Sequence, residues 1–133
     1  MSLILITILA VGLGGAAGAA RADLADEQDI NSGLLAISVA DKIRRECSQI
    51  SGRFLTGRAY ATQLKSMASQ RGYSDEEIET YVNDSAGKAK MRERRNAYFK
   101  SKGASNLDAA SLCRLGRDEI KNRSLIGSFL KVK

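Results

Sequence analysis

The sequence predicts an all-α domain: a small bundle of about five helices held by one disulfide, preceded by an N-terminal hydrophobic signal or anchor helix. Three observations lead to this prediction. Apolar side chains recur every three or four residues along most of the chain. No segment alternates convincingly with a period of two, so no sheet is expected. Only two cysteines occur, at Cys47 and Cys113, and 133 residues suit a single domain.

Residues 1–22 are expected to form a secretory signal peptide or a retained signal anchor. Residues 3–20 carry no charge, and Ala20-Arg21-Ala22 is a small-x-small site of the kind that signal peptidases cut. The missing basic residue before the apolar core is atypical. As a helix, residues 3–20 would span roughly 27 Å, against about 30 Å for a bilayer core. The sequence favours cleavage, and the alternative is an inner-membrane anchor. Either way, residues 23–133 are expected to form a periplasmic helical domain.

The first expected helix follows an apolar stripe that starts at Ile30, with Gly52 as a break or bend. The stripe consists of Ile30, Leu34, Ile37, Ala40, Ile43, Cys47, Ile50 and Phe54. Its spacing places Cys47 on the inward face. A second stripe, from Tyr60 through Leu64 and Met67, predicts a second helix that ends at Gly72, a C′ glycine.

The strongest local motif starts the third helix. Ser74 is followed by Asp75-Glu76-Glu77, so Glu77 occupies the N3 position of a capping box. Tyr73 can pack on Ile78 as a hydrophobic staple. A carboxylate cluster for metal binding or acid–base catalysis is the alternative interpretation. Helix initiation is preferred because every position matches the capping pattern.

The remaining helices lie in the C-terminal half. The third helix is expected to bend or restart near residues 83–87 and to run to Gly103. A loop over 103–107 precedes a helix over about 108–122, and Ser124 is the expected cap of a last short helix.

The two cysteines predict a disulfide, Cys47–Cys113, between the first helix and the fourth or fifth, since an even pair in an exported protein is usually oxidised. The alternative is a redox-active pair, because Arg44 and Arg45 precede Cys47 and could activate its thiolate. The absence of histidine excludes Ser-His-Asp and Cys-His catalysis, imidazole-ligated haem and HExxH metal sites. No CxxC motif occurs, and no metal or other cofactor is expected.

Charge is segregated along the chain. Residues 23–87 hold 7 basic and 11 acidic side chains, whereas residues 88–133 hold 13 basic and 4 acidic ones. The densest run contains Lys88, Lys90, Arg92, Arg94 and Arg95. The run is either a solvated helix face or a surface that docks on anionic lipid headgroups or an acidic protein. Nucleic-acid binding is not expected, because no aromatic stacking platform accompanies the charge and the chain is expected to be exported.

An ordered set of short motifs resembles a known family. The motifs are Gly33-Leu34-Leu35, Cys47-Ser48-Gln49-Ile50-Ser51, residues 72–78, Tyr81-Val82-Asn83-Asp84, Gly103-Ala104, Cys113-Arg114-Leu115-Gly116 and Ile126-Gly127. The pattern is similar to that of small exported alphaproteobacterial proteins classed only as a domain of unknown function. The resemblance covers most of residues 23–133 and implies a periplasmic, helical, disulfide-linked domain. It transfers no catalytic residue.

Two functional hypotheses follow. The first is a non-enzymatic accessory or assembly subunit on the periplasmic side of a bacterial membrane complex, docked through the basic run; a photosynthetic or respiratory complex is a guess from lineage. The second is a soluble periplasmic factor that binds a small molecule or peptide. Small residues could leave a groove for such a ligand or permit close helix packing, and they are Gly33, Ala36, Gly57, Ala61 and Gly116. No enzymatic activity is expected, and the sequence indicates no oligomeric state.

Overall fold

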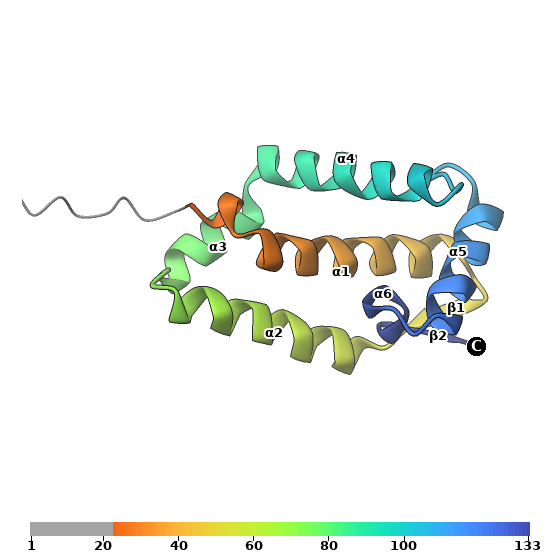
Figure 1. Cartoon of the computed structure of the whole chain (residues 1–133), viewed down its shortest axis with the longest axis horizontal. Helices are drawn as coiled ribbons and strands as arrows, with labels where there is room; N and C mark the ends of the chain where they lie inside the picture. Colours follow the sequence, from red (N-terminus) through yellow and green to blue (C-terminus); the bar gives the residue numbers. More distant parts are fainter. Residues whose placement is uncertain (1–22) are drawn as a thin grey trace, which may run out of the picture.

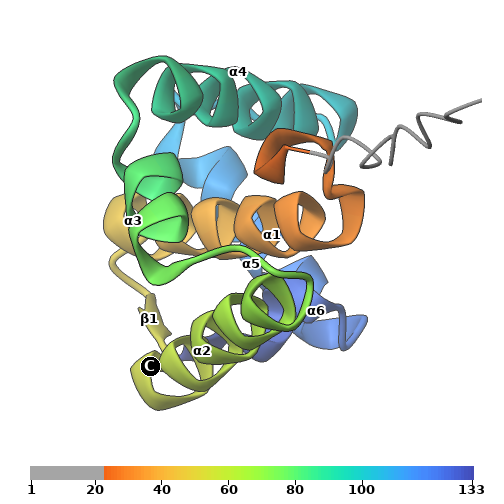
Figure 2. The same cartoon turned by 90° about the vertical axis from the view of Figure 1, so that its left-hand side faces the viewer.

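Helix α1 (Gln28–Glu46) is the central element of the computed structural model, which describes residues 23–133. It lies between α4 (Ser85–Ser101) and α2 (Phe54–Gln70), as Figures 1 and 2 show. Val39 and Ile43 of α1 are fully buried. Because neighbours cover α1 on several sides, its apolar side chains form the middle of the main core.

One end of the fold is closed by the C-terminal elements. Helices α5 (Ala109–Lys121) and α6 (Leu125–Ser128) lie there beside strands β1 (Ile50–Gly52) and β2 (Leu130–Val132) (Figure 1). The strands pair antiparallel, with Ile50 opposite Val132 and Gly52 opposite Leu130.

This small sheet shows that the prediction of no sheet was wrong. Each strand has three residues, which is too short for a period of two to be recognised in the sequence. Ile50 and Leu130 are each about 1% exposed, so the pairing brings two core residues from distant parts of the chain together.

The opposite end of the fold contains a second, smaller core. The 3-10 helix η1 (Leu24–Asp26) and helix α3 (Asp75–Asn83) lie there, and the buried residues are Leu24, Ile30, Ala68 and Tyr73. The Glu77 backbone N–H donates to Ser74 Oγ at 3.1 Å, which confirms the expected cap of α3. Ile78 packs against the same cluster as Tyr73, as the hydrophobic staple requires.

The described residues form six α-helices, where the sequence predicted about five. The expected third helix is two helices, because Asp84 ends α3 and its carboxylate accepts the Gly87 N–H at 2.7 Å as the N-cap of α4. The first helix ends at Glu46, earlier than the stripe suggested. The apolar pattern in the sequence continues beyond the helix because Cys47, in the loop, and Ile50, in β1, are also buried in the main core. The last helix is a single turn that stops before Phe129.

Two glycines end helices through left-handed backbone. Gly72 has φ of 94° after α2, as its sequence position predicted, and Gly103 has φ of 69° after α4. The expected signal or anchor over residues 1–22 lies outside the described residues. Among residues 23–133, no helix is long and apolar enough to cross a bilayer.

Candidate functional site

Four of the five predicted docking residues are exposed on α4. Lys88, Lys90, Arg92 and Arg94 are exposed, and none of them forms an ion pair within residues 23–133. Helix α4 packs against α1 and α3 and buries only two of its side chains, so most of its circumference stays in solvent (Figure 1). We call these four residues the α4 cations.

Their spacing places like charges next to each other. Lys88 and Arg92 are four residues apart, as are Lys90 and Arg94. A like-charge pair at this spacing destabilises a helix by roughly 0.2–0.5 kcal/mol, and the only acid within the run is Glu93. The arrangement therefore costs α4 some stability, which an anionic partner would offset.

Helix α1 shows the opposite pattern. Lys42 pairs with Glu46 at 2.8 Å. Asp41 accepts from Arg44 at 2.6 Å and from Arg45 at 2.9 Å. The cations of α1 are thus neutralised within their own helix, unlike those of α4.

Arg95 is separated from the α4 cations by burial. It is about 8% exposed, its guanidinium donates to Asn96 Oδ1 at 3.2 Å, and it lies 6.0 Å from the Phe99 ring centroid. Burial and the nearby Arg45 and Arg92 lower its pKa. The sequence analysis predicted Arg95 as a docking residue together with the exposed run. The structure corrects this prediction, because Arg95 lies on the side of α4 that faces α1 and is buried there.

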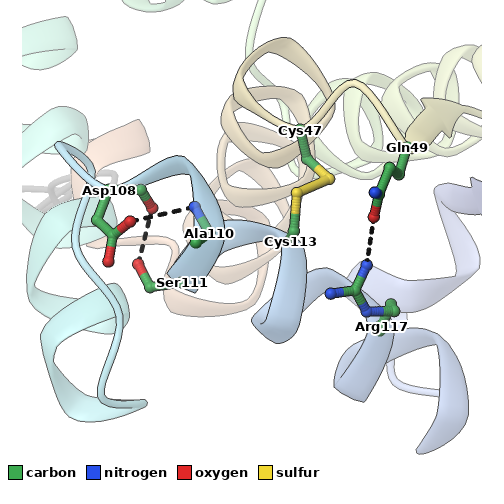
Figure 3. Close-up of a disulfide and its surroundings, with 7 residues drawn as sticks. All are labelled: Cys47, Gln49, Asp108, Ala110, Ser111, Cys113 and Arg117. Carbon is green, nitrogen blue, oxygen red and sulfur yellow. Dashed lines mark hydrogen bonds between the residues drawn. A yellow bond between two sulfur atoms is a disulfide. The ribbon is translucent and has the colours of Figure 1, made fainter.

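The predicted disulfide is formed. Cys47 caps the C-terminus of α1 and Cys113 lies on α5, with the Sγ atoms 2.04 Å apart and the Cα atoms 5.2 Å apart (Figure 3). Cys47 is fully buried. Beside the bond, Arg117 of α5 donates to Gln49 Oε1 at 2.8 Å, so a second contact joins the same two segments. Cys113 is partly buried. The full burial of Cys47 favours a structural cross-link over a reactive pair, because a buried sulfur is poorly accessible to a thiol.

Most of the small residues serve close packing. A Cβ on Gly33 would lie 2.8 Å from a Leu64 methyl group, and one on Gly116 would lie 2.5 Å from Ile50 Cδ1. Ala36 is buried in the main core. Gly57 differs, since a Cβ there would meet no atom within 4 Å. Ala61 is exposed on α2. The five residues therefore do not form one shared groove.

The acidic residues of α3 lie on the surface of the helix. Glu76, Glu77 and Glu79 are exposed, and the first two lie in the first turn of the helix that Ser74 caps. Among residues 23–133, no group of three or more Cys, Asp or Glu side chains is placed to hold a metal ion.

One buried polar network escaped the sequence analysis. Glu119 of α5 is about 7% exposed, and its carboxylate accepts hydrogen bonds from the hydroxyls of Tyr98 and Ser124. The Gly127 N–H in turn donates to Ser124 Oγ at 3.0 Å. Burial, and then the bond to Glu119, raises the pKa of the Tyr98 hydroxyl. The network joins α4, α5 and α6, and this contact between three helices leaves no local sequence pattern.

Comparisons with known proteins identify the family of the chain. A family model described as a family of unknown function, DUF5333, matches residues 22–131. The search of curated proteins finds no match, and neither does the search of solved structures. Since the family model spans nearly all of the described residues, the chain belongs to the DUF5333 family of unknown function.

Proposed function

We propose that the protein is a non-enzymatic accessory or assembly subunit that docks on a bacterial membrane complex from the periplasmic side. The observation that carries the proposal is the set of four exposed α4 cations without ion-pair partners in residues 23–133. A photosynthetic or respiratory complex is one candidate for the partner.

The electrostatics of α4 are suited to recruitment. Each Lys or Arg near an anionic surface contributes about 1 kcal/mol at modest ionic strength, so four such residues are a substantial attraction. A surface of one sign also accelerates encounter with a partner of the opposite sign. Both effects weaken with salt because the Debye length is about 8 Å at physiological ionic strength.

The layout of charge favours an acidic protein over a lipid surface. Acidic residues are concentrated at the end of the fold formed by η1, the start of α1, and α3 (Figure 1). They are Asp23, Asp26, Glu27, Asp29, Asp75, Glu76, Glu77, Glu79 and Asp84. An anchor over residues 3–20 would attach at Asp23 and hold this acidic end at the bilayer. Anionic headgroups would repel the acidic end of the domain. An acidic protein surface beside the domain is therefore the better partner for the α4 cations.

Export is supported by the cross-link. Disulfides persist in oxidising compartments such as the bacterial periplasm and are rare in the cytosol. The Cys47–Cys113 bond, together with the expected signal or anchor over residues 1–22, is consistent with a periplasmic domain.

The test is copurification with the membrane fraction of the source cell. One variant replaces the four α4 cations, Lys88, Lys90, Arg92 and Arg94, with Gln. Arg95 stays, because it is buried and its loss would confuse docking with folding. The matched control removes the same charge elsewhere, by replacing the exposed Lys65, Lys121, Lys131 and Lys133 with Gln.

We expect the α4 variant to lose copurification and the control to keep it. Copurification of both variants at the wild-type level would refute docking through α4. Equal loss in both would show that net charge, and not this surface, is responsible. Intact-mass measurement of the membrane and periplasmic fractions shows in parallel whether residues 1–22 are retained.

A further inference from the structure

We propose that a groove across the middle of α1 binds an acidic amphipathic helix of the partner protein. The groove consists of two apolar pockets, one on each side of α1, which share Ile37 and Asp41. The inference rests on the proposed function and names the surface and the chemistry of the partner segment.

The first pocket lies between α1 and the start of α2. It has a volume of about 200 Å³, and Ile37, Phe54, Gly57 and Phe129 contribute to its wall. Phe54 is 65% exposed although it is a large apolar residue. The space beside Gly57 is open, because a Cβ there would meet no atom within 4 Å.

The second pocket lies between α1, α3 and α4. Its volume is about 250 Å³, and Leu34, Ile37, Val82 and Met91 form most of its apolar wall. Val82 of α3 is 44% exposed at its edge. At about 30 Å³ per water molecule, each pocket has room for roughly seven or eight waters, or one large apolar side chain.

The charged residues around the two pockets indicate that the partner segment carries negative charge. Arg44, Arg53 and Arg58 line the first pocket, and Lys88 lines the second. The only carboxylate lining either pocket is Asp41, which Arg44 and Arg45 already engage. Within residues 23–133, Arg53, Arg58 and Lys88 form no ion pair, so carboxylates on an incoming segment would find unneutralised cations.

The division of the groove favours a helix over an acyl chain. Ile37 and Asp41 lie one helical turn apart on α1 and separate the two pockets. A continuous hydrocarbon chain would have to cross beside the Asp41 carboxylate, which is unfavourable. An amphipathic helix instead presents separate apolar anchors at helical spacing and carries acidic residues beside them. This geometry matches two pockets with a basic rim.

Binding is tested on the full chain with a synthetic peptide of about 14 residues, roughly four helical turns, which carries Leu on one face and Glu elsewhere. One control peptide has Ser in place of Leu, and the other has Gln in place of Glu. Gly57→Leu fills the first pocket without a backbone clash. Its size-matched control is Ala61→Leu, at an exposed position one turn further along α2.

The charge test combines Arg58→Gln with Lys88→Gln, and its control combines Lys121→Gln with Lys131→Gln. In fluorescence anisotropy we expect Gly57→Leu to weaken binding of the Leu/Glu peptide about tenfold, as for a central anchor, and Ala61→Leu to leave it within about twofold. The charge variant should weaken binding about fivefold at low salt and less at high salt. Both control peptides should bind more weakly than the Leu/Glu peptide.

Four outcomes would overturn the inference. The first is no binding of the Leu/Glu peptide, or equal binding by wild type and Gly57→Leu. The second is a preference for the Gln peptide. The third is binding of phosphatidylglycerol vesicles that Gly57→Leu abolishes, which would assign the groove to lipid. The fourth is a wild-type dimer that Gly57→Leu dissociates, which would assign it to a second copy of the chain.

The same variants separate this inference from the proposed function. Gly57→Leu leaves the α4 cations intact. If the Gly57→Leu variant still copurifies with the membrane complex but the α4 variant does not, the groove does not bind the partner and docking through α4 stands. If neither variant affects copurification, the proposed function itself fails.

Discussion

Reduction of the Cys47–Cys113 bond tests how far the stability of this domain depends on one cross-link. The bond joins residues 66 apart in sequence and connects the end of α1 to α5. Breaking it releases the unfolded chain from a long closed loop, while the packing of α1 on α5 remains available to the folded state. The perturbation therefore acts mainly on the unfolded ensemble.

The magnitude follows from the loop length. For a separation of 66 residues, the chain-entropy relation gives about 4 kcal/mol of stabilisation at 25 °C. Domains of this size are commonly stable by about 5–15 kcal/mol, so the cross-link supplies a large fraction. We expect the reduced domain to be marginally stable and still helical, because the apolar side chains of the two cores can stay packed when the bond is broken.

The assay is urea unfolding followed by circular dichroism, with and without a phosphine reductant. For small domains the urea m-value is about 1–3 kcal/mol/M, so a loss of 4 kcal/mol lowers the midpoint by about 2 M at a central m-value of 2. Intact mass without reductant should show the oxidised form lighter by two hydrogen atoms. The Cys47→Ala/Cys113→Ala double variant is the control, since its midpoint should not respond to reductant.

Two results would refute this reasoning. A midpoint shift equivalent to less than about 1 kcal/mol would show that the unfolded chain is not constrained as the loop model requires. A large change in circular dichroism on reduction under native conditions would show that the bond holds the fold itself. Rapid reduction of the folded protein would instead favour the redox-active interpretation of the cysteine pair.

Four further predictions use single substitutions. Gly127→Ala should destabilise the domain by about 1–3 kcal/mol in thermal melts, because its Cβ would lie 2.1 Å from a backbone oxygen of α5. The Cβ of Gly57→Ala would meet no atom within 4 Å, so this substitution should stabilise the domain by up to about 1 kcal/mol. Equal changes in stability for Gly127→Ala and Gly57→Ala would contradict the packing argument. The hydrogen bond from Arg71 lowers the pKa of Asp29 from 3.8 to about 2, so its stabilisation is present above pH 4 and is lost as the pH falls towards 2. Asp29→Asn should remove this part of the acid sensitivity of urea midpoints, and an unchanged profile would refute the assignment. Ser74→Ala should cost about 1 kcal/mol through the lost N-cap, measured by urea unfolding, and no change would mean that the cap is dispensable.

The predictions that succeeded depend on short stretches of sequence. Ser74 and Ser124 cap helices in the structure as expected, because a side-chain oxygen reaches an N–H only three residues away. Gly72 ends α2 for an equally local reason, its tolerance of positive φ. The disulfide was predictable because the chain has only two cysteines, and an even pair in an exported protein is usually oxidised.

The docking surface was predictable in part. The exposed α4 cations follow from the density of basic residues between Lys88 and Arg95. The burial of Arg95 does not, since it depends on where α1 lies against α4. The arginines of the first pocket have no sequence signature, because Arg44 lies on α1 and meets Arg53 and Arg58 at the start of α2 only when the two helices pack together.

The sequence by itself determined the helical class, the helix starts at Ser74 and Ser124, the cross-link and the segregation of charge. The tertiary structure alone decided the pairing of β1 with β2 and the buried network around Glu119. Caps and periodicity are set by interactions within a few residues, so they can be recognised in one dimension. Strand pairing, buried polar contacts and grooves arise between segments that are far apart in the chain, and only the packed fold brings those segments together.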